Sequence, residues 1–264
     1  MSTFAYEFLN QLDEQWREVD LLISEARVAQ DGGKNEFYDV LCRSASFLIV
    51  SHLEGFVKGL TKCAIRDLNS QVQFKDMPAA IKRTYCKKYI GFDENTLPNY
   101  NDRINDMISD LEKSQDIKVC DTPFIFDKNR NPKPESIKIV FERFGVKDIF
   151  QCLHESVFDE AFSARRKLKQ LLNIMSWHIR RTLREYPYET KAENLKLSPQ
   201  KYNKRTLWSE FLDETNRIRH SIAHGNSFSN DESIEAIEEK RDKARLFQLI
   251  AIYILYNEIN VSTE

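Results

Sequence analysis

Two histidines and two arginines lie close together near the C-terminal end of the sequence. Residues 217–225 read Arg-Ile-Arg-His-Ser-Ile-Ala-His-Gly, so that His220 and His224 are four residues apart. An imidazole with an ordinary pKa of ~6.5 gives or takes a proton near neutral pH. A guanidinium donates paired hydrogen bonds to an anionic group. Together these residue types predict acid–base chemistry at a centre that becomes negatively charged.

A helix must position these side chains, because the segment leading into them has helical periodicity. Its apolar residues recur at spacings of four, seven and four, at Leu207, Phe211, Ile218 and Ile222. At about 100° per residue, with Ile218 as zero, His220 lies near 200°, His224 near 240° and Arg217 near 260°. We therefore expect these three residues on the face opposite the core stripe. Gly225 should end the helix in the left-handed conformation.

The same histidine spacing also occurs in metal-binding helices, and this alternative is weaker. The segment lacks the glutamate that zinc peptidases carry after the first histidine. A metal needs at least one more protein ligand, for which Cys152-Leu153-His154 is a poor candidate. We predict no metal site and no cofactor.

The composition is that of a soluble globular protein. The chain has 264 residues, 41% of them apolar and 30% charged, with only seven glycines and seven prolines, which favours helix. Five cysteines without a Cys-x-x-Cys pair predict reduced thiols in a cytoplasm. The N-terminus has no export signal. The longest apolar stretch, Leu249–Tyr256, falls short of the roughly 18 residues of a membrane span, so no membrane partner is expected.

Periodicity predicts an all-α fold, an antiparallel helical bundle in a single domain. The expected helices cover about 3–29, 35–68, 77–90, 100–114, 135–144, 153–186, 207–224 and 232–259. Residues 122–126 could form a short strand, and a turn-rich connector follows at 129–134. The last helix is nearly apolar from Leu246 to Tyr256 and should be buried in the core or at a subunit interface.

Glu54 interrupts an apolar row on the second helix, formed with Phe47, Val50 and Val57. A buried carboxylate is costly unless it is paired or hydrogen-bonded. We expect Glu54 to be buried and to have a cationic partner, one of the arginines near residue 219.

Positive charge is concentrated between residues 161 and 205, which hold 12 Lys or Arg and three Glu in a chain of net charge −2. Arg165, Arg166, Arg180 and Arg181 share one expected helix. Such a stretch is typical of a phosphate-contacting surface, and equally of a solvated helix face. We expect these four arginines to bind RNA if the first interpretation holds.

The segment Arg-His-Ser-Ile-Ala-His-Gly resembles the Arg…His signature of the HEPN superfamily. Ser51-His52-Leu53-Glu54-Gly55-Phe56-Val57-Lys58 is similar to a segment on the second helix of its MAE-type bacterial branch. Leu53 stands where tryptophan is usual, and residues 151–206 form a basic helical insertion before the motif helix.

The resemblance implies a metal-independent endoribonuclease of toxin or phage-defence type. It implies a homodimer with the motif helices facing each other, RNA as the substrate, and an antitoxin or inhibitor protein as a further partner. His224 would be the acid/base and Arg219 the anion stabiliser, with Arg217 also fitting the spacing. Asn216, His220 and Glu54 would support them. The alternative is a non-catalytic HEPN module that dimerises and binds a nucleotide or a partner protein.

Overall fold

The computed structural model describes residues 2–114, 116–125, 133–188, 197, 204–224 and 232–261. The helices, in chain order, are α1 (Phe4–Asp31), α2 (Asn35–Gln71), α3 (Ala79–Ile90), α4 (Tyr100–Glu112), α5 (Pro134–Arg143), α6 (Ile149–Leu153), α7 (Arg165–Thr182), α8 (Leu207–Ala223) and α9 (Ile234–Glu258). Three short 3-10 helices are η1 (Phe74–Asp76), η2 (Thr122–Phe124) and η3 (Val157–Phe162). Within these ranges there is no β-strand, so the predicted all-α class is confirmed.

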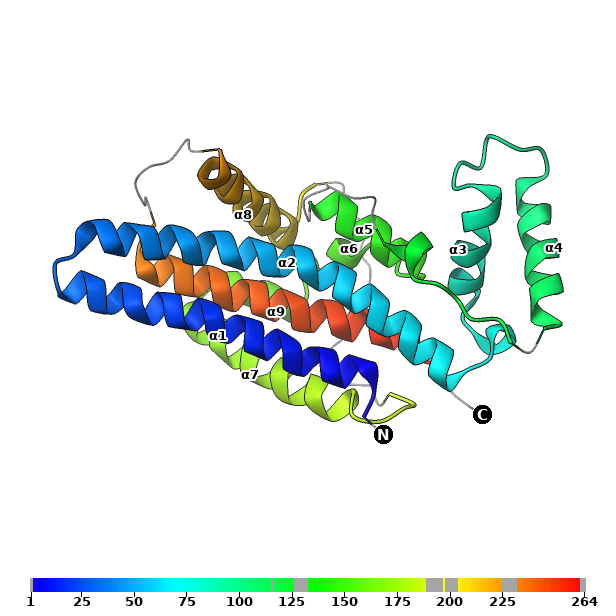
Figure 1. Ribbon diagram of the computed structural model, residues 1–264, viewed down its shortest axis with the longest axis horizontal. Helices are drawn as coiled ribbons and strands as arrows, with labels where there is room; N and C mark the ends of the chain where they lie inside the picture. The colour runs from blue at the N-terminus through cyan, green and yellow to red at the C-terminus, as the bar shows by residue number, and fades with distance from the viewer. Residues whose placement is uncertain are drawn as a thin grey trace.

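Helices α1 and α2 form a long antiparallel hairpin along the molecule (Figure 1). They pack closely at Gly59 of α2, where a Cβ atom would lie 2.4 Å from the ring of Phe8. Phe8 is buried and stacks on Phe56, with 6.1 Å between ring centroids. The hairpin therefore depends on a glycine inside an otherwise regular helix.

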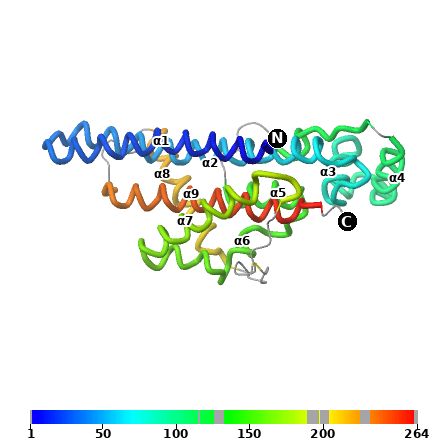
Figure 2. Tube along the Cα trace, turned by 90° about the horizontal axis from the view of Figure 1, so that it is seen from below, coloured from blue at the N-terminus to red at the C-terminus, as the bar shows by residue number. Residues whose placement is uncertain are grey.

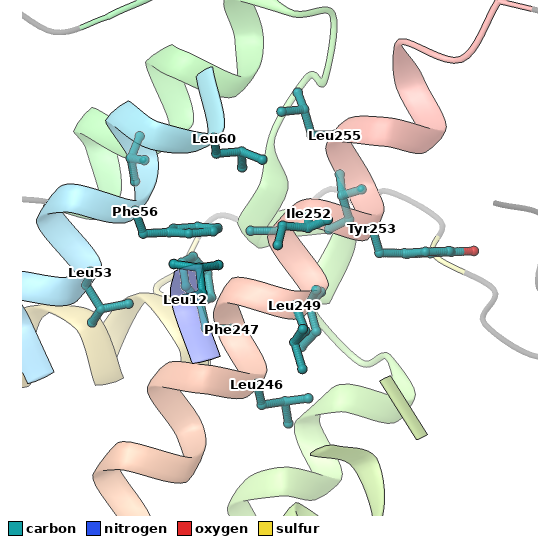
Figure 3. Close-up of a cluster of buried hydrophobic side chains, with 14 of the residues drawn as sticks. Leu12, Leu53, Phe56, Leu60, Leu246, Phe247, Leu249, Ile252, Tyr253 and Leu255 are labelled. Carbon is teal, nitrogen blue, oxygen red and sulfur yellow. The ribbon is translucent and has the colours of Figure 1, made fainter. Parts of the chain in front are cut away.

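Helix α9 lies between the α1–α2 hairpin and α7 (Figure 2). Every residue from Leu246 to Tyr256 is buried, which confirms the predicted burial and places it in the core of one chain. Figure 3 shows Phe56 of α2 pointing toward Ile252 of α9. The polar member of the run, Gln248, accepts a 2.8 Å hydrogen bond from the indole N–H of Trp16.

A buried carboxylate ties three helices together at one end of the bundle. Asp67 of α2 accepts hydrogen bonds from the backbone N–H groups of Phe4 (2.8 Å) and Ala5 (3.0 Å), which begin α1. It also accepts one from the hydroxyl of Tyr256 in α9, at 3.2 Å. Burial raises the pKa of Asp67 above its ordinary value.

The helix predicted from Leu153 to Tyr186 was wrong in its extent, because the segment folds as the end of α6, then η3 and α7. Glu155 adopts a φ of 54°, in the left-handed region that a right-handed helix cannot contain. The Ser156 side chain accepts a hydrogen bond from the N–H of Phe158 and starts η3. This local capping stops the helix although the apolar period continues.

The short strand predicted at residues 122–126 was also wrong. Thr122–Phe124 forms η2, with Pro123 in its first turn, where a fixed φ is acceptable. Phe124 packs into the core against Phe144, 4.8 Å between ring centroids. Residue 126 and residues 129–132 of the predicted connector lie outside the described residues.

Helices α3 and α4 stand at one end of the molecule, beyond the bundle (Figures 1 and 2). They pack on each other around a small cluster of their own, formed by Cys86, Tyr100 and Ile104.

Among the described helices, α2 alone is long and apolar enough to suit a membrane span by length and composition. In this fold 56% of that apolar window is buried inside the bundle, so much of it contributes to the core.

We predict that Gly59→Ala destabilises the protein by about 1–3 kcal/mol, because the new methyl group overpacks the buried Phe8 ring. Gly55→Ala, on the same helix with nothing within 4 Å, is the control and should stabilise by ~0.5–1 kcal/mol. Urea unfolding of both variants measures the difference. Equal free energies of unfolding would show that α1 and α2 tolerate a wider separation.

Candidate functional site

Helix α8 lies across α2 on the side away from α1 (Figure 1). Its start is fixed by a capping box between Thr206 and Ser209. Its inner face is anchored by Trp208, which packs against Phe162 and Phe247 at ring-centroid distances of 4.9 and 6.0 Å. The N-terminal half of α8 is therefore held in the core.

The predicted core stripe of this helix was rotated from its true position. The buried residues are Trp208, Ser209, Leu212, Thr215 and Asn216. Leu207 is 42% exposed, whereas Phe211, Ile218 and Ile222 are half-buried at the border. The true inner face is centred about 120° from Ile218, close to the position of Arg219. The sequence pattern missed this because the buried face includes threonine, serine and asparagine.

His220 and His224 form a pair at the end of α8. Their ring centroids are 4.1 Å apart and their planes are inclined by 57°. Helix α8 ends at Ala223, and the backbone N–H of His224 donates to the carbonyl of His220 at 3.1 Å. Both histidines are exposed, in agreement with the predicted position outside the core stripe. Gly225 lies outside the described residues.

Arg219 is directed at α2, away from the exposed face. Its guanidinium forms an ion pair with Glu54 at 3.3 Å and lies over the ring of Phe47, 5.6 Å from the centroid. The predicted partner of Glu54 is thus present, but the predicted burial was wrong. The Glu54 side chain is 43% exposed and that of Arg219 is 23% exposed. The apolar row around Glu54 reaches the molecular surface at Phe47, which is itself 37% exposed.

Arg217 extends from the exposed face and pairs with Glu214 one turn earlier. Its Nε donates to one carboxylate oxygen at 2.9 Å and its terminal nitrogen to the other at 2.6 Å. The hydrogen bond from Arg217 lowers the pKa of Glu214. The sequence reasoning missed Glu214, although its spacing of three residues from Arg217 is a sign of such a pair.

Asn216 is buried under α8, where its side-chain amide donates to the carbonyl of Leu212 at 2.8 Å. Asn216 lies one turn before His220 on the helix, but its side chain is buried, so it contributes to the helix and the core.

A buried lysine near the site was also missed by the sequence reasoning. Lys240 of α9 forms an ion pair with Glu232, which also accepts a hydrogen bond from the hydroxyl of Ser46 on α2. Burial lowers the pKa of Lys240. This arrangement holds the chain immediately before α9 against α2. In the sequence, a serine on the inner face of α2 is the one residue that indicates it.

The four arginines expected to bind RNA divide into two pairs. Arg165 forms an ion pair with Glu238 of α9, and Arg180 with Asp13 of α1. Arg166 and Arg181 are exposed, and Arg181 lies over the ring of Trp177 at 5.6 Å. The side chains of Arg165 and Arg180 are still 39% exposed, but their charges are paired, whereas Arg166 and Arg181 form no ion pair within the described residues.

The described residues bring together no group of three or more His, Cys, Asp or Glu side chains that could hold a metal ion. The chemistry available to the site is that of two solvent-facing imidazoles, on the same helix as two guanidinium groups that each contact a carboxylate.

The sequence matches a known protein family. A sequence model of the RiboL-PSP-HEPN family matches residues 12–256, nearly the whole chain. The chain belongs to this HEPN family. The match confirms the resemblance to the HEPN superfamily, and it runs through the 151–206 segment. No curated protein and no solved structure matches the chain significantly. HEPN membership indicates a nuclease-type or RNA-related role.

We predict that the Arg219–Glu54 pair contributes little to stability, because both side chains reach solvent. A double-mutant cycle with Glu54→Gln and Arg219→Gln, followed by urea unfolding, should give a coupling energy of ~0.2–1 kcal/mol. A coupling of several kcal/mol would mean that the pair is buried, for example by a second subunit.

Proposed function

We propose that this HEPN protein is a metal-independent endoribonuclease of toxin or phage-defence type, with its site at a homodimer interface. The observation that carries the proposal is the exposed His220–His224 pair, held 4.1 Å apart at the end of a helix whose other half is anchored in the core. Membership of the HEPN family supports an RNA-related reaction.

In the proposed reaction the 2′-OH oxygen of RNA attacks the adjacent phosphorus and the bond to the 5′-oxygen breaks. His224 is the acid/base that moves a proton to or from these oxygens, and His220 orients RNA or its neighbour. A guanidinium neutralises the charge that develops on the phosphorane oxygens. The products are a 2′,3′-cyclic phosphate and a 5′-hydroxyl.

In the proposed site, a second copy of the chain would supply the arginine. Within one chain Arg219 is turned toward Glu54 and Phe47, whereas the histidines face solvent. On our estimate from the helical period, Arg219 lies about 140° from His224 around α8. We therefore infer that Arg219 of one subunit acts with the histidines of the other, or that Arg217 on the exposed face takes its place.

Exposed apolar side chains support a dimer interface along this edge. Phe37, Val40 and Phe47 follow one another on the outer face of α2 and are 51%, 48% and 37% exposed. They recur at three- and seven-residue spacings, so they line one face of the helix beside α8. A row of this kind marks a protein contact more often than a free surface.

We predict that the purified protein cleaves RNA in the presence of a chelator and leaves cyclic phosphate ends. His224→Ala should lower the rate ~10² to 10⁴-fold, the cost of removing a general acid/base, while circular dichroism shows an unchanged helical fold. Gel analysis with end-group mapping measures both. Cleavage that requires a divalent metal and leaves 5′-phosphates would falsify this mechanism. No cleavage of any RNA would favour a nucleotide- or protein-binding HEPN module.

Mixing two inactive variants tests the shared site. Arg219→Ala and His224→Ala proteins, each inactive alone, form mixed dimers after exchange of subunits. If arginine and histidine act across the interface, each mixed dimer holds one intact pair and activity returns. Activity stays absent if both act within one chain. Arg217→Ala is the control, and a greater loss with this variant would assign the anion-stabilising role to Arg217.

We further predict that Phe47→Glu gives a monomer by light scattering at micromolar concentration, because it places a charge in the proposed apolar contact. Leu21→Glu, at a more accessible apolar site on α1, should leave the dimer intact. A wild-type protein that is monomeric at this concentration would contradict the proposed interface.

A further inference from the structure

Helix α7 has an outer face that takes no part in the hydrophobic core and carries none of the motif residues 217–225. Its inner face is fully occupied by Leu168, Leu171, Leu172, Met175, Ile179 and Thr182, all of them buried. On the outer face two large apolar side chains remain in solvent, Trp177 at 63% and Ile174 at 56% exposure. An indole exposed to this degree on a helix needs a reason.

The outer face of α7 carries only positive charge. The helix contains no Asp or Glu between Arg165 and Thr182. Arg166 and Arg181 lie within about 40° of Trp177 around the helix axis, and Arg184 is exposed just beyond its end. In the part of the chain that the structure describes, none of these three arginines forms an ion pair, in contrast to Arg165 and Arg180.

Arg181 and Trp177 already form a stacked unit, with the guanidinium carbon 5.6 Å from the ring centroid. An aromatic ring that lies beside a cation provides the two contacts that a single-stranded nucleic acid uses. A base stacks on the ring, and its phosphate pairs with the cation. Stacking on the ring requires no particular base, because every base has a π-face.

From these observations we propose that the outer face of α7, formed by Arg166, Trp177, Arg181 and Arg184, binds single-stranded RNA, with a base stacked on Trp177. That the ligand is RNA rests on the proposed function. Figure 1 places α8 above α2 and the end of α7 below α1, at opposite edges of the bundle. The surface is therefore separate from the histidine pair and holds a part of the RNA that is not being cleaved.

An anionic membrane would also attract these arginines, but the apolar part of the face is too small for it. A helix that lies in a lipid interface buries a broad apolar face. Here the apolar face of α7 is used by the core, and Ile174 and Trp177 are flanked by the exposed polar residues Gln170 and Asn173.

The tryptophans of this chain make a direct measurement practical. Trp16 and Trp208 are 2% and 0% exposed, so Trp177 is the indole that a soluble ligand can reach. We expect oligouridylate to quench the fluorescence of the His224→Ala protein, which binds RNA without cleaving it. Trp177→Ala in this background should abolish the quenching and raise the Kd, measured by anisotropy of labelled RNA, about 5- to 100-fold. Leu21→Ala, with the same 63% exposure, is the matched control and should change neither.

Neighbouring arginines provide a second control. Arg181→Gln should lower the slope of log Kobs against log salt concentration by about 0.7, the loss of one phosphate contact on a single strand. Arg180→Gln removes the same charge from the adjacent residue, but that charge is paired with Asp13 and the slope should stay unchanged.

The proposal is overturned if oligouridylate leaves the fluorescence unchanged, if Trp177→Ala binds RNA as tightly as its parent, or if both arginine variants give the same slope. It is also overturned if phosphatidylserine vesicles quench Trp177 and oligouridylate does not. Because binding is measured in an inactive variant, a wild type that never cleaves RNA would refute the proposed reaction and leave this surface standing.

Discussion

The fold depends on the need to cover one helix on every side. From Leu246 to Tyr256, α9 is buried around its whole circumference and is apolar except at Gln248, and each large apolar side chain there contributes roughly 1.5–3 kcal/mol when it leaves water. No single neighbour can cover such a helix. The α1–α2 hairpin covers it from one side and α7 from the other (Figure 2), whereas α8 reaches it through Trp208 and Phe247. Polar contacts around this core, such as Trp16 with Gln248 and Asp67 with Tyr256, then set the positions of the helices along one another.

The position of the histidine pair follows from this arrangement. Only the first half of α8 has side chains that the core accepts, so the second half extends along the outer edge of α2. A helix that is anchored at one end and exposed at the other can hold two imidazoles at a fixed distance while both remain accessible. The ion pair of Arg219 with Glu54 joins the exposed half to α2 without burying it. The histidines thus stand on a regular helix and remain exposed to solvent.

Features that depend on long apolar periods could be predicted from the sequence, and those that depend on local polar contacts could not. The bounds of α1, α2 and α9 follow closely from spacing, and the exposure of His220 and His224 was predicted as well, although from a core stripe that proved to be rotated. The rotation of α8 was missed because Thr215 and Asn216 are buried there through hydrogen bonds to their own helix. The break before η3 was missed because a serine cap and a left-handed glutamate decide it. On α7, each paired arginine is next in the sequence to an unpaired one. They differ because acids of α1 and α9 lie within reach of only one of the two, which the sequence pattern does not show.

The α3–α4 hairpin has a small hydrophobic cluster of its own, which favours local opening at that end of the molecule. Cys86, Tyr100 and Ile104 form a cluster separate from the main core, at the end of the bundle that is far from α8. Contacts that are confined to a small unit let that unit open without the rest. Helix α3 also reaches the main core through Ile81 and Tyr85, so amide hydrogens of α4 should exchange with solvent by local opening more readily than those of α3 or α9. The exposed loop between α3 and α4 is accordingly a place where a length change or a fused domain should disturb the fold little.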